Sequence, residues 1–209
     1  MKYLAKLCIV LCAGMLVAPY GGVAGTVPEV PVAPVAPSVD EAAAEEKARK
    51  YFTDLEVIDQ NGNKLHFYSD VLKGRVVLIN FIFTNCQDYC PMVTQKLIQT
   101  RNHMVEVVKD EVWYVSISID PERDTPEAMK AFAKKQGVDE SRWVFLTGDK
   151  QNLDFIVKRL GQYTQEVESH STLMLAGNTI TRHWTRVMPM VPPDSIAQQM
   201  RALVEETPG

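Results

Sequence analysis

The chain has 209 residues, of which 46% are hydrophobic and 23% are charged, and its formal net charge is −4. This length and composition fit one globular domain with appended segments. A domain of about 150 residues buries roughly 70% of the surface of its unfolded chain, so it needs no disulfide for stability. The acidic balance gives no reason to expect nucleic acid as a partner.

The N-terminal segment has the pattern of a secretory signal. Lys2 and Lys6 form a short basic region, residues 7–18 are largely apolar, and small residues follow. We place the cleavage site after Ala24 and expect a periplasmic or otherwise exported protein. The alternative is an uncleaved anchor that tethers the protein to the inner membrane, although a spanning helix needs about 20 apolar residues and would have to tolerate Lys6.

A linker is expected between this segment and the folded domain. Residues 26–38 are rich in Pro, Val and Ala, which is typical of an extended spacer. Residues 39–50 are rich in Ala, Glu and Lys and favour a short helix. We therefore divide the chain into a signal or anchor (1–24), a linker (25–50) and a folded domain (51–209).

Within the domain, hydrophobic periodicity and turn residues predict alternating strands and helices. In chain order, the predicted strands are 52–58, 64–67, 75–83, 112–119, 143–147, 171–176 and 179–186. The predicted helices are 92–109, 126–136, 150–160 and 193–206, with a turn at 69–72. Asn61-Gly62-Asn63 and Gly177-Asn178 are expected to form the tight turns of two hairpins. Thr125, Pro126 and Gly137 are cap residues for the second of these helices.

This order of elements predicts an α/β fold. Right-handed crossovers place the strand at 112–119 parallel to the strand at 75–83. The predicted architecture resembles a thioredoxin-like fold, with a central sheet flanked by helices and an added N-terminal hairpin.

Two cysteines follow the apolar strand at 75–83. Cys86 and Cys90 are four positions apart, and Pro91 comes next. Because proline is tolerated in the first turn of a helix, Cys90 lies at or just before a helix start. The two sulfurs are therefore expected at the carboxyl end of a central strand, where open α/β sheets bind their ligands.

A helix N-terminus favours the thiolate form of cysteine. Two adjacent thiolates repel unless they are oxidised to a disulfide or bridged by a cation, so the pair indicates either redox or metal chemistry. With residues 1–24 removed, Cys86 and Cys90 are the remaining cysteines, and a purely structural disulfide is a third interpretation.

One histidine favours the metal. Redox proteins of this fold usually carry two residues between the cysteines and a proline before the strand that faces them. Here three residues separate the cysteines, and no proline occurs between Pro126 and Pro189. On the predicted fold, His170 takes the place of that proline. Two thiolates and an imidazole suit copper in either oxidation state, whereas zinc would normally need a fourth ligand.

Other candidate residues have simpler explanations beside the functional one. Asp120 ends the neighbouring strand and could point into the same site, or it could form an Asp-Pro turn with Arg123 and Asp124 holding the loop. Met188 and Met190 are soft potential copper ligands, but we favour core packing for both. We treat the other histidines as surface or hydrogen-bonded residues: His66, His103 and His183.

The segments FTNCQDYCP, SIDPERDTP, WVFLTG and ESHSTLML, in this order, resemble the Sco/SenC proteins over residues 52–205. The resemblance implies a thioredoxin-like copper protein of the periplasm or of a membrane-facing space. Such proteins help to assemble the binuclear copper centre of cytochrome c oxidase, by delivering copper, by reducing the cysteines of the centre, or by both. The implied partner is a copper-accepting oxidase subunit or another copper protein.

The ligands that this resemblance implies for Cu+ or Cu2+ are Cys86, Cys90 and His170. Asp88 matches the acidic residue between the cysteines, and Asp120 matches the acid near the site. The alternative function is a periplasmic thiol–disulfide oxidoreductase that uses Cys86 and Cys90 without a metal.

The sequence also departs from the family pattern around the expected ligands. Asn85, Gln87, Tyr89 and Ser169 stand where other residues are common. Such neighbours tune metal affinity and redox potential, so these departures bear on the client and on the balance between copper delivery and thiol reduction.

Overall fold

The computed structural model describes residues 39–104, 108, 110–163 and 172–208. In this part of the chain, seven strands form one sheet. The strands are β1 (Glu56–Asp59), β2 (Lys64–His66), β3 (Val76–Ile82), β4 (Val112–Ser118), β5 (Trp143–Thr147), β6 (Met174–Asn178) and β7 (His183–Val187). The helices are α1 (Val39–Phe52), η1 (Phe67–Leu72), α2 (Tyr89–His103), α4 (Pro126–Gln136), η2 (Glu140–Arg142), α5 (Lys150–Arg159) and α6 (Pro193–Glu205).

The sheet has the strand order β2-β1-β5-β4-β3-β6-β7. β3 pairs in parallel with β4 along its whole length, from Val76 opposite Val112 to Ile82 opposite Ser118, as the crossover rule predicts. β5 is parallel to β4, whereas β1 and β6 run antiparallel to their central neighbours. The carboxyl ends of β3 and β4 therefore meet at one edge, and the loops that follow them are neighbours.

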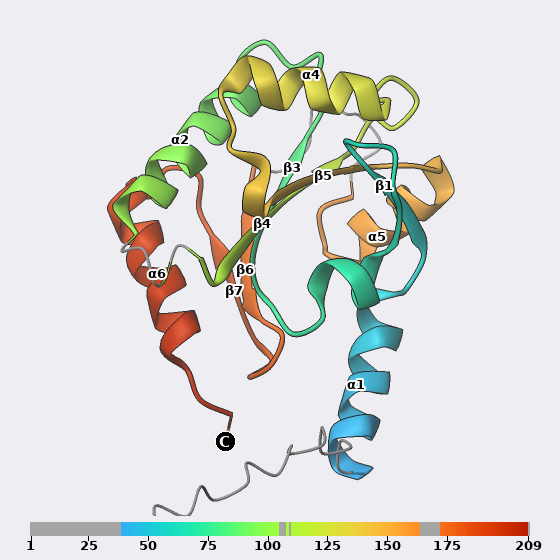
Figure 1. The fold of residues 1–209 in the computed structure, drawn as a ribbon, viewed down its shortest axis with the longest axis vertical. Helices are drawn as coiled ribbons and strands as arrows, with labels where there is room; N and C mark the ends of the chain where they lie inside the picture. The colour runs from blue at the N-terminus through green and yellow to red at the C-terminus, as the bar shows by residue number, and fades with distance from the viewer. Residues whose placement is uncertain (1–38, 105–107, 109, 164–171, 209) are drawn as a thin grey trace, which may run out of the picture. The chain divides into compact units, whose positions relative to one another are not determined.

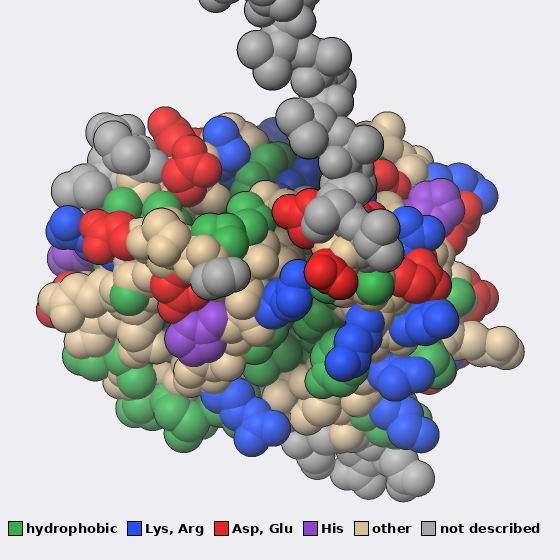
Figure 2. Space-filling view, turned by 90° about the horizontal axis from the view of Figure 1, so that it is seen from below, with side chains coloured by type: hydrophobic (Ala, Val, Ile, Leu, Met, Phe, Trp, Pro, Cys, Tyr) green, Lys and Arg blue, Asp and Glu red, His purple; other side chains and the backbone are tan. Residues whose placement is uncertain are grey.

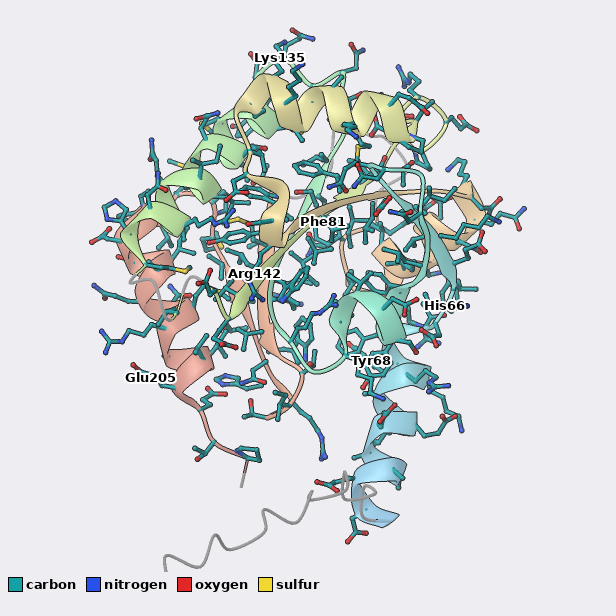
Figure 3. All side chains as sticks on the ribbon, viewed as in Figure 1. His66, Tyr68, Phe81, Lys135, Arg142 and Glu205 are labelled. Atoms are coloured by element: carbon teal, nitrogen blue, oxygen red, sulfur yellow. The ribbon has the colours of Figure 1, made fainter. Side chains whose placement is uncertain are left out.

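Helices cover both faces of the sheet, so the predicted thioredoxin-like α/β fold is confirmed. α2 and α6 lie on one side, and α1 and α5 lie on the other (Figure 1). All seven residues of β3 are buried, with alternate side chains in the two cores, as period-two alternation requires. Phe81 of β3 and Tyr68 of η1 belong to the core on the α1 and α5 side (Figure 3).

The predicted caps of α4 are confirmed. The Thr125 hydroxyl accepts a hydrogen bond from the Ala128 N–H, and Pro126 is the first helical residue. Gly137 adopts a left-handed conformation with a φ of 72° and ends the helix. The loop after β4 therefore ends at Thr125, where α4 begins.

The turn between β6 and β7 differs from the prediction. It spans residues 179–182, and Gly177 is paired with Trp184 inside the ladder. A Cβ atom at Gly177 would lie 2.4 Å from the Trp184 ring. Glycine is therefore needed here because the indole lies against the backbone, and not because of the turn. The side chain of Asn178 organises the turn, because its oxygen accepts hydrogen bonds from the N–H groups of Ile180 and Thr181.

α2 begins earlier and ends earlier than predicted. It starts at Tyr89 and ends at His103, because the next residue, Met104, has an extended conformation. Most of the remaining predicted stretch, residues 105–107 and 109, lies outside the described residues. The earlier start places Cys90 and Pro91 within the first helical turn, where proline's missing N–H has no intrahelical acceptor.

The surface carries charges of both signs. In the view of Figure 2, Lys and Arg side chains lie among Asp and Glu side chains and patches of apolar surface. Lys135, on the outer side of α4, is one of the solvent-exposed cations (Figure 3). Within the described ranges, no helix is both long enough and apolar enough to cross a membrane.

Candidate metal centre

The two cysteines lie on the connection from β3 to α2. Cys86 is in the loop, where its N–H donates to the Phe83 carbonyl at 3.1 Å. Cys90 is the second residue of α2. The cysteines are not joined by a disulfide in this structure. Both therefore lie at the carboxyl end of a buried strand and at the start of a helix, as the sequence predicts.

A hydrogen bond joins the two cysteines directly. The backbone N–H of Cys90 donates to the Cys86 sulfur at 3.3 Å. Asp88 occupies the N-cap position of α2, but among the described residues its side chain makes no capping hydrogen bond. The Cys86 sulfur thus satisfies one of the helix's unpaired amide donors.

The two thiols differ in environment. Cys86 is partly exposed, whereas only 2% of Cys90 is accessible. The pKa of Cys90 is raised to about 12, mainly by burial. The neighbouring Cys86 and Asp124 side chains contribute to this increase, whereas a hydrogen bond with the Phe83 backbone opposes it. At neutral pH, Cys90 therefore holds its proton until a metal or an oxidant removes it.

A buried carboxylate ties the cysteine loop to β4. Asp124, which is fully buried, accepts hydrogen bonds from the Thr84 N–H at 2.9 Å and from the Thr84 hydroxyl at 2.6 Å. Its other oxygen accepts from the Ser118 hydroxyl at 2.6 Å. The sequence prediction had Asp124 holding its own loop but missed Thr84. The available signal was the sequence Asp124-Thr125-Pro126 before α4. It places an acidic side chain in the loop after β4, the strand that pairs with β3.

The two predicted acidic neighbours have different surroundings. Asp120 is buried and forms an ion pair with Arg123, whose Nε lies 2.7 Å from Oδ2. Burial raises the pKa of Asp120, the Arg123 charge opposes this, and Asp124 adds to it. This geometry matches the Asp-Pro turn interpretation, and a role of Asp120 toward the cysteines stays a prediction. Asp88 is exposed and lines the hollow beside Cys86.

That hollow has a volume of about 730 Å³ and opens on the Cys86 side of the pair. Its wall comes from three segments that are distant in sequence: residues 83 and 85–89, residues 172–173, and residues 188–189. The cysteine loop thus faces the start of β6 and the turn after β7. This enclosure brings a thiol, a carboxylate and a thioether to one space, through Cys86, Asp88 and Met188.

The prediction that Met188 and Met190 pack in the core is wrong. Met188 is 55% exposed and Met190 is 78% exposed. The physical reason is the turn that carries them: Pro189 and Pro192 cannot continue a strand ladder, and the Val191 N–H closes the turn on the Met188 carbonyl at 3.2 Å.

His170 lies outside the described residues, so its predicted place beside the cysteines stays a prediction. Thr172, two positions further along the chain, lines the hollow together with Cys86. Among the residues that the structure does describe, no group of three His, Cys, Asp or Glu side chains is arranged to hold a metal ion.

A thioredoxin-like sheet with two cysteines four positions apart at the start of a helix defines a class of dithiol-bearing α/β proteins. Within this class, the family model of SCO1/SenC matches residues 43–205. The chain belongs to the SCO1/SenC family, which confirms the predicted resemblance.

Known relatives agree with this assignment. The SCO2-like protein of Rickettsia conorii is 41% identical over 103 residues, which cover 48% of this chain and 46% of the relative. The chain thus spans about half the length of the curated relatives it matches.

Two solved structures are similar to this chain over most of the described domain. ScoI of Bradyrhizobium japonicum, solved with copper bound, has a TM-score of 0.60 and 26% identity, with coverage of 71% of this chain and 96% of its own. A SCO1/SenC family lipoprotein of Bacillus anthracis has a TM-score of 0.62 and 28% identity, with coverage of 72% and 93%.

Proposed function

We propose that this protein carries copper on its dithiol and serves the assembly of a respiratory cytochrome c oxidase. The proposed ligands are Cys86, Cys90 and His170. The observation that carries the proposal is the contact between the two cysteines at the start of α2, open to a hollow on the Cys86 side. Two thiolates and an imidazole form a soft ligand set that suits copper.

Chain connectivity supports His170 as the third ligand. Thr172 lines the same hollow as Cys86, and two residues of extended chain span at most about 7 Å. An imidazole at position 170 is therefore within reach of the hollow by chain length alone. The buried Cys90 thiol fits a metal ligand as well, because metal binding displaces the proton that burial otherwise holds there.

Family membership supports copper as the cargo. The Bradyrhizobium japonicum relative was solved with copper bound, and we extend that metal to this chain. The proposed client is the binuclear copper centre of the oxidase, with a copper-accepting subunit or another copper protein as the recipient. Asp88 and Asp120 are the proposed acidic neighbours of the metal, of which Asp88 borders the hollow.

Native mass spectrometry of the full-length protein, loaded anaerobically with Cu(I), tests the proposal. Cys8 and Cys12 are changed to serine in every sample, so that bound copper reports on the domain. We expect copper on the parent protein, and its loss in Cys86→Ser and in Cys90→Ser. His66→Ala is the matched control, because His66 is exposed and pairs with Asp70 on a different part of the surface. Copper retained by both serine variants would refute the proposal.

A second candidate function is thiol–disulfide exchange with a client. The observation that favours it is the asymmetry of the pair, with a partly exposed Cys86 and a buried Cys90. The Cys86 thiolate would attack a client disulfide, form a mixed disulfide and release one client thiolate. Cys90 would then lose its proton and attack the Cys86 sulfur, which releases the second client thiolate and leaves a Cys86–Cys90 disulfide. This function needs both cysteines but not His170. A His170→Ala variant that still reduces the client disulfide at the parent's rate would therefore support it.

The proposal includes export from the cytoplasm. Residues 1–24 have the pattern of a secretory signal or anchor, residues 25–50 are the proposed linker, and residues 51–209 are the proposed copper-binding domain. The Bacillus anthracis relative is described as a lipoprotein, which agrees with a membrane-facing location. The N-terminus of protein purified from the periplasm, read by mass spectrometry, distinguishes a cleaved signal from an anchor.

A further inference from the structure

The hollow beside the dithiol has a thioether on its rim. Met188 lines it together with Cys86, and more than half of the Met188 side chain is exposed. Most other methionines in the described domain are core residues: Met104, Met129, Met174 and Met200. Met188 is thus not part of the core, and its thioether is available at the hollow that Cys86 borders.

The turn that carries Met188 is fixed to the helix that carries Cys90. The Lys96 ammonium of α2 donates to the Pro189 carbonyl and, at 3.2 Å, to the Val191 carbonyl. These contacts hold the backbone on either side of the turn against α2. The Met188 side chain itself is unbranched and has three rotatable bonds, so its sulfur can follow a ligand across the hollow.

Accessibility sets the order in which copper meets the sulfurs. Cys90 is 2% exposed and does not line the hollow, whereas Cys86 is partly exposed and Met188 is 55% exposed. A thioether carries no proton and no charge, and as a soft ligand it suits Cu(I). An incoming Cu(I) ion therefore reaches the Met188 and Cys86 sulfurs before it reaches Cys90.

We infer that the Met188 and Cys86 sulfurs form a receiving site for Cu(I), occupied before copper moves to Cys90. This inference rests on the proposed copper-carrying function and adds a ligand to it. The bonds from copper to its donor break as bonds to the Cys86 and Met188 sulfurs form, and the Cys86 proton passes to water. Cys90 then replaces Met188 and releases its own proton, while copper stays Cu(I) throughout.

A trapped intermediate tests the inference. Cys90→Ser in the full-length protein, again with Cys8 and Cys12 changed to serine, keeps Cys86 and Met188 but blocks the final site. Cu(I) is supplied as a complex with a coloured chelator, and competition gives the affinity. We expect Met188→Leu in this background to weaken Cu(I) binding about tenfold or more, because loss of a ligand should cost at least as much as loss of a hydrogen-bond partner of a ligand. Leucine keeps the side-chain volume, and the position is exposed, so the fold is retained.

Two other methionines provide matched controls. Met190 is 78% exposed and Met92 is 47% exposed, yet neither lines the hollow. Met190→Leu and Met92→Leu in the Cys90→Ser background should bind Cu(I) with unchanged affinity. Equal weakening by all three leucine substitutions would overturn the inference, because it would show a general effect of exposed thioethers.

Selenium spectroscopy gives a readout that does not depend on affinity. In selenomethionine-labelled Cys90→Ser protein, the selenium-edge X-ray absorption spectrum should contain a copper neighbour. Met188→Leu should remove this neighbour, and Met190→Leu should keep it. If wild-type copper binding requires the cysteines but Met188→Leu changes neither readout, only this inference fails. If the cysteines themselves are dispensable, the proposed function fails as well.

Discussion

Thr84 and Asp124 are joined by two hydrogen bonds, at 2.9 and 2.6 Å, between the cysteine loop and the loop after β4. Asp124 also accepts from the Ser118 hydroxyl at 2.6 Å and is fully buried. The position of the loop that carries Cys86 therefore depends on one carboxylate from the neighbouring strand.

Removal of this carboxylate should destabilise the domain. Asp124→Ala leaves the Thr84 N–H and the Ser118 hydroxyl without their acceptor. Hydrogen bonds to charged groups contribute about 1.5–3 kcal/mol each, so we expect the free energy of unfolding to fall by about 3 kcal/mol. Urea denaturation of the apo protein measures it. Asp154→Asn, which removes an exposed i,i+4 pair with Lys150, should change the value by about 0.5 kcal/mol or less. Equal values for the two variants would contradict the role assigned to Asp124.

Stability of the reduced protein should fall as the pH rises above about 9. The pKa of Cys90 is raised by burial from 9.0 to about 12, so between these values the unfolded chain loses a proton that the folded chain keeps. The free energy of unfolding therefore falls with rising pH, by up to about 1.4 kcal/mol per pH unit. Urea unfolding between pH 8 and pH 10, under reducing conditions, measures this slope.

Cys90→Ala is the control for that slope. The variant is expected to be less stable at every pH, but its stability should lack the Cys90 contribution to the decline above pH 9. Tyr114 has a pKa that burial raises above its usual value of 10.0, so its contribution begins at higher pH. An identical slope in the variant and the parent would show that Cys90 does not carry the effect.

The two thiols should react with alkylating agents in a fixed order. Cys86 is partly exposed, while Cys90 is buried and protonated at neutral pH. Because the thiolate is the reactive form and the pKa of Cys90 is raised from 9.0 to about 12, Cys90 should react on the order of a thousandfold more slowly than an ordinary thiol. Peptide mapping after timed iodoacetamide treatment at pH 7.5 follows both sites. Faster modification of Cys90 than of Cys86 would contradict the buried position of Cys90.

The close approach of Gly177 to Trp184 should make Gly177→Ala destabilising. A Cβ atom there would lie 2.4 Å from the indole, which packs against Phe52 with ring centroids 4.8 Å apart. Overpacking of this kind costs about 1–3 kcal/mol. Thermal or urea unfolding measures the loss. In a Trp184→Thr background the same substitution should cost much less, and an equal cost in both backgrounds would exclude the indole as the cause.

The sequence predicts those parts of the fold that local chemistry determines. The apolar run of β3, the Pro91 signal for the start of α2, and the caps at Thr125 and Gly137 each specify their own neighbourhood. The position of Cys90 follows from the same signals. These predictions need no knowledge of which segments meet in space.

The features that the sequence did not predict depend on contacts between distant segments. Gly177 is predicted as a turn residue, because only the facing Trp184 reveals the close approach. The hydrogen bonds of Asp124 to Thr84 cross between two loops 40 positions apart. Met188 looks like a core residue until Lys96 is seen to hold its turn at the surface. A single sequence does not show which of its distant segments come into contact.

The most direct test of the central claim is the copper affinity of His170→Ala compared with the parent full-length protein. Both carry serine at positions 8 and 12, and both are titrated with Cu(I) against a chelator and with Cu(II) by visible absorption. A shared site of two sulfurs and one imidazole predicts weaker binding of both ions, by about tenfold or more, with a changed Cu(II) spectrum. Unchanged affinities and an unchanged spectrum would remove His170 from the site and leave the dithiol alone as the functional group.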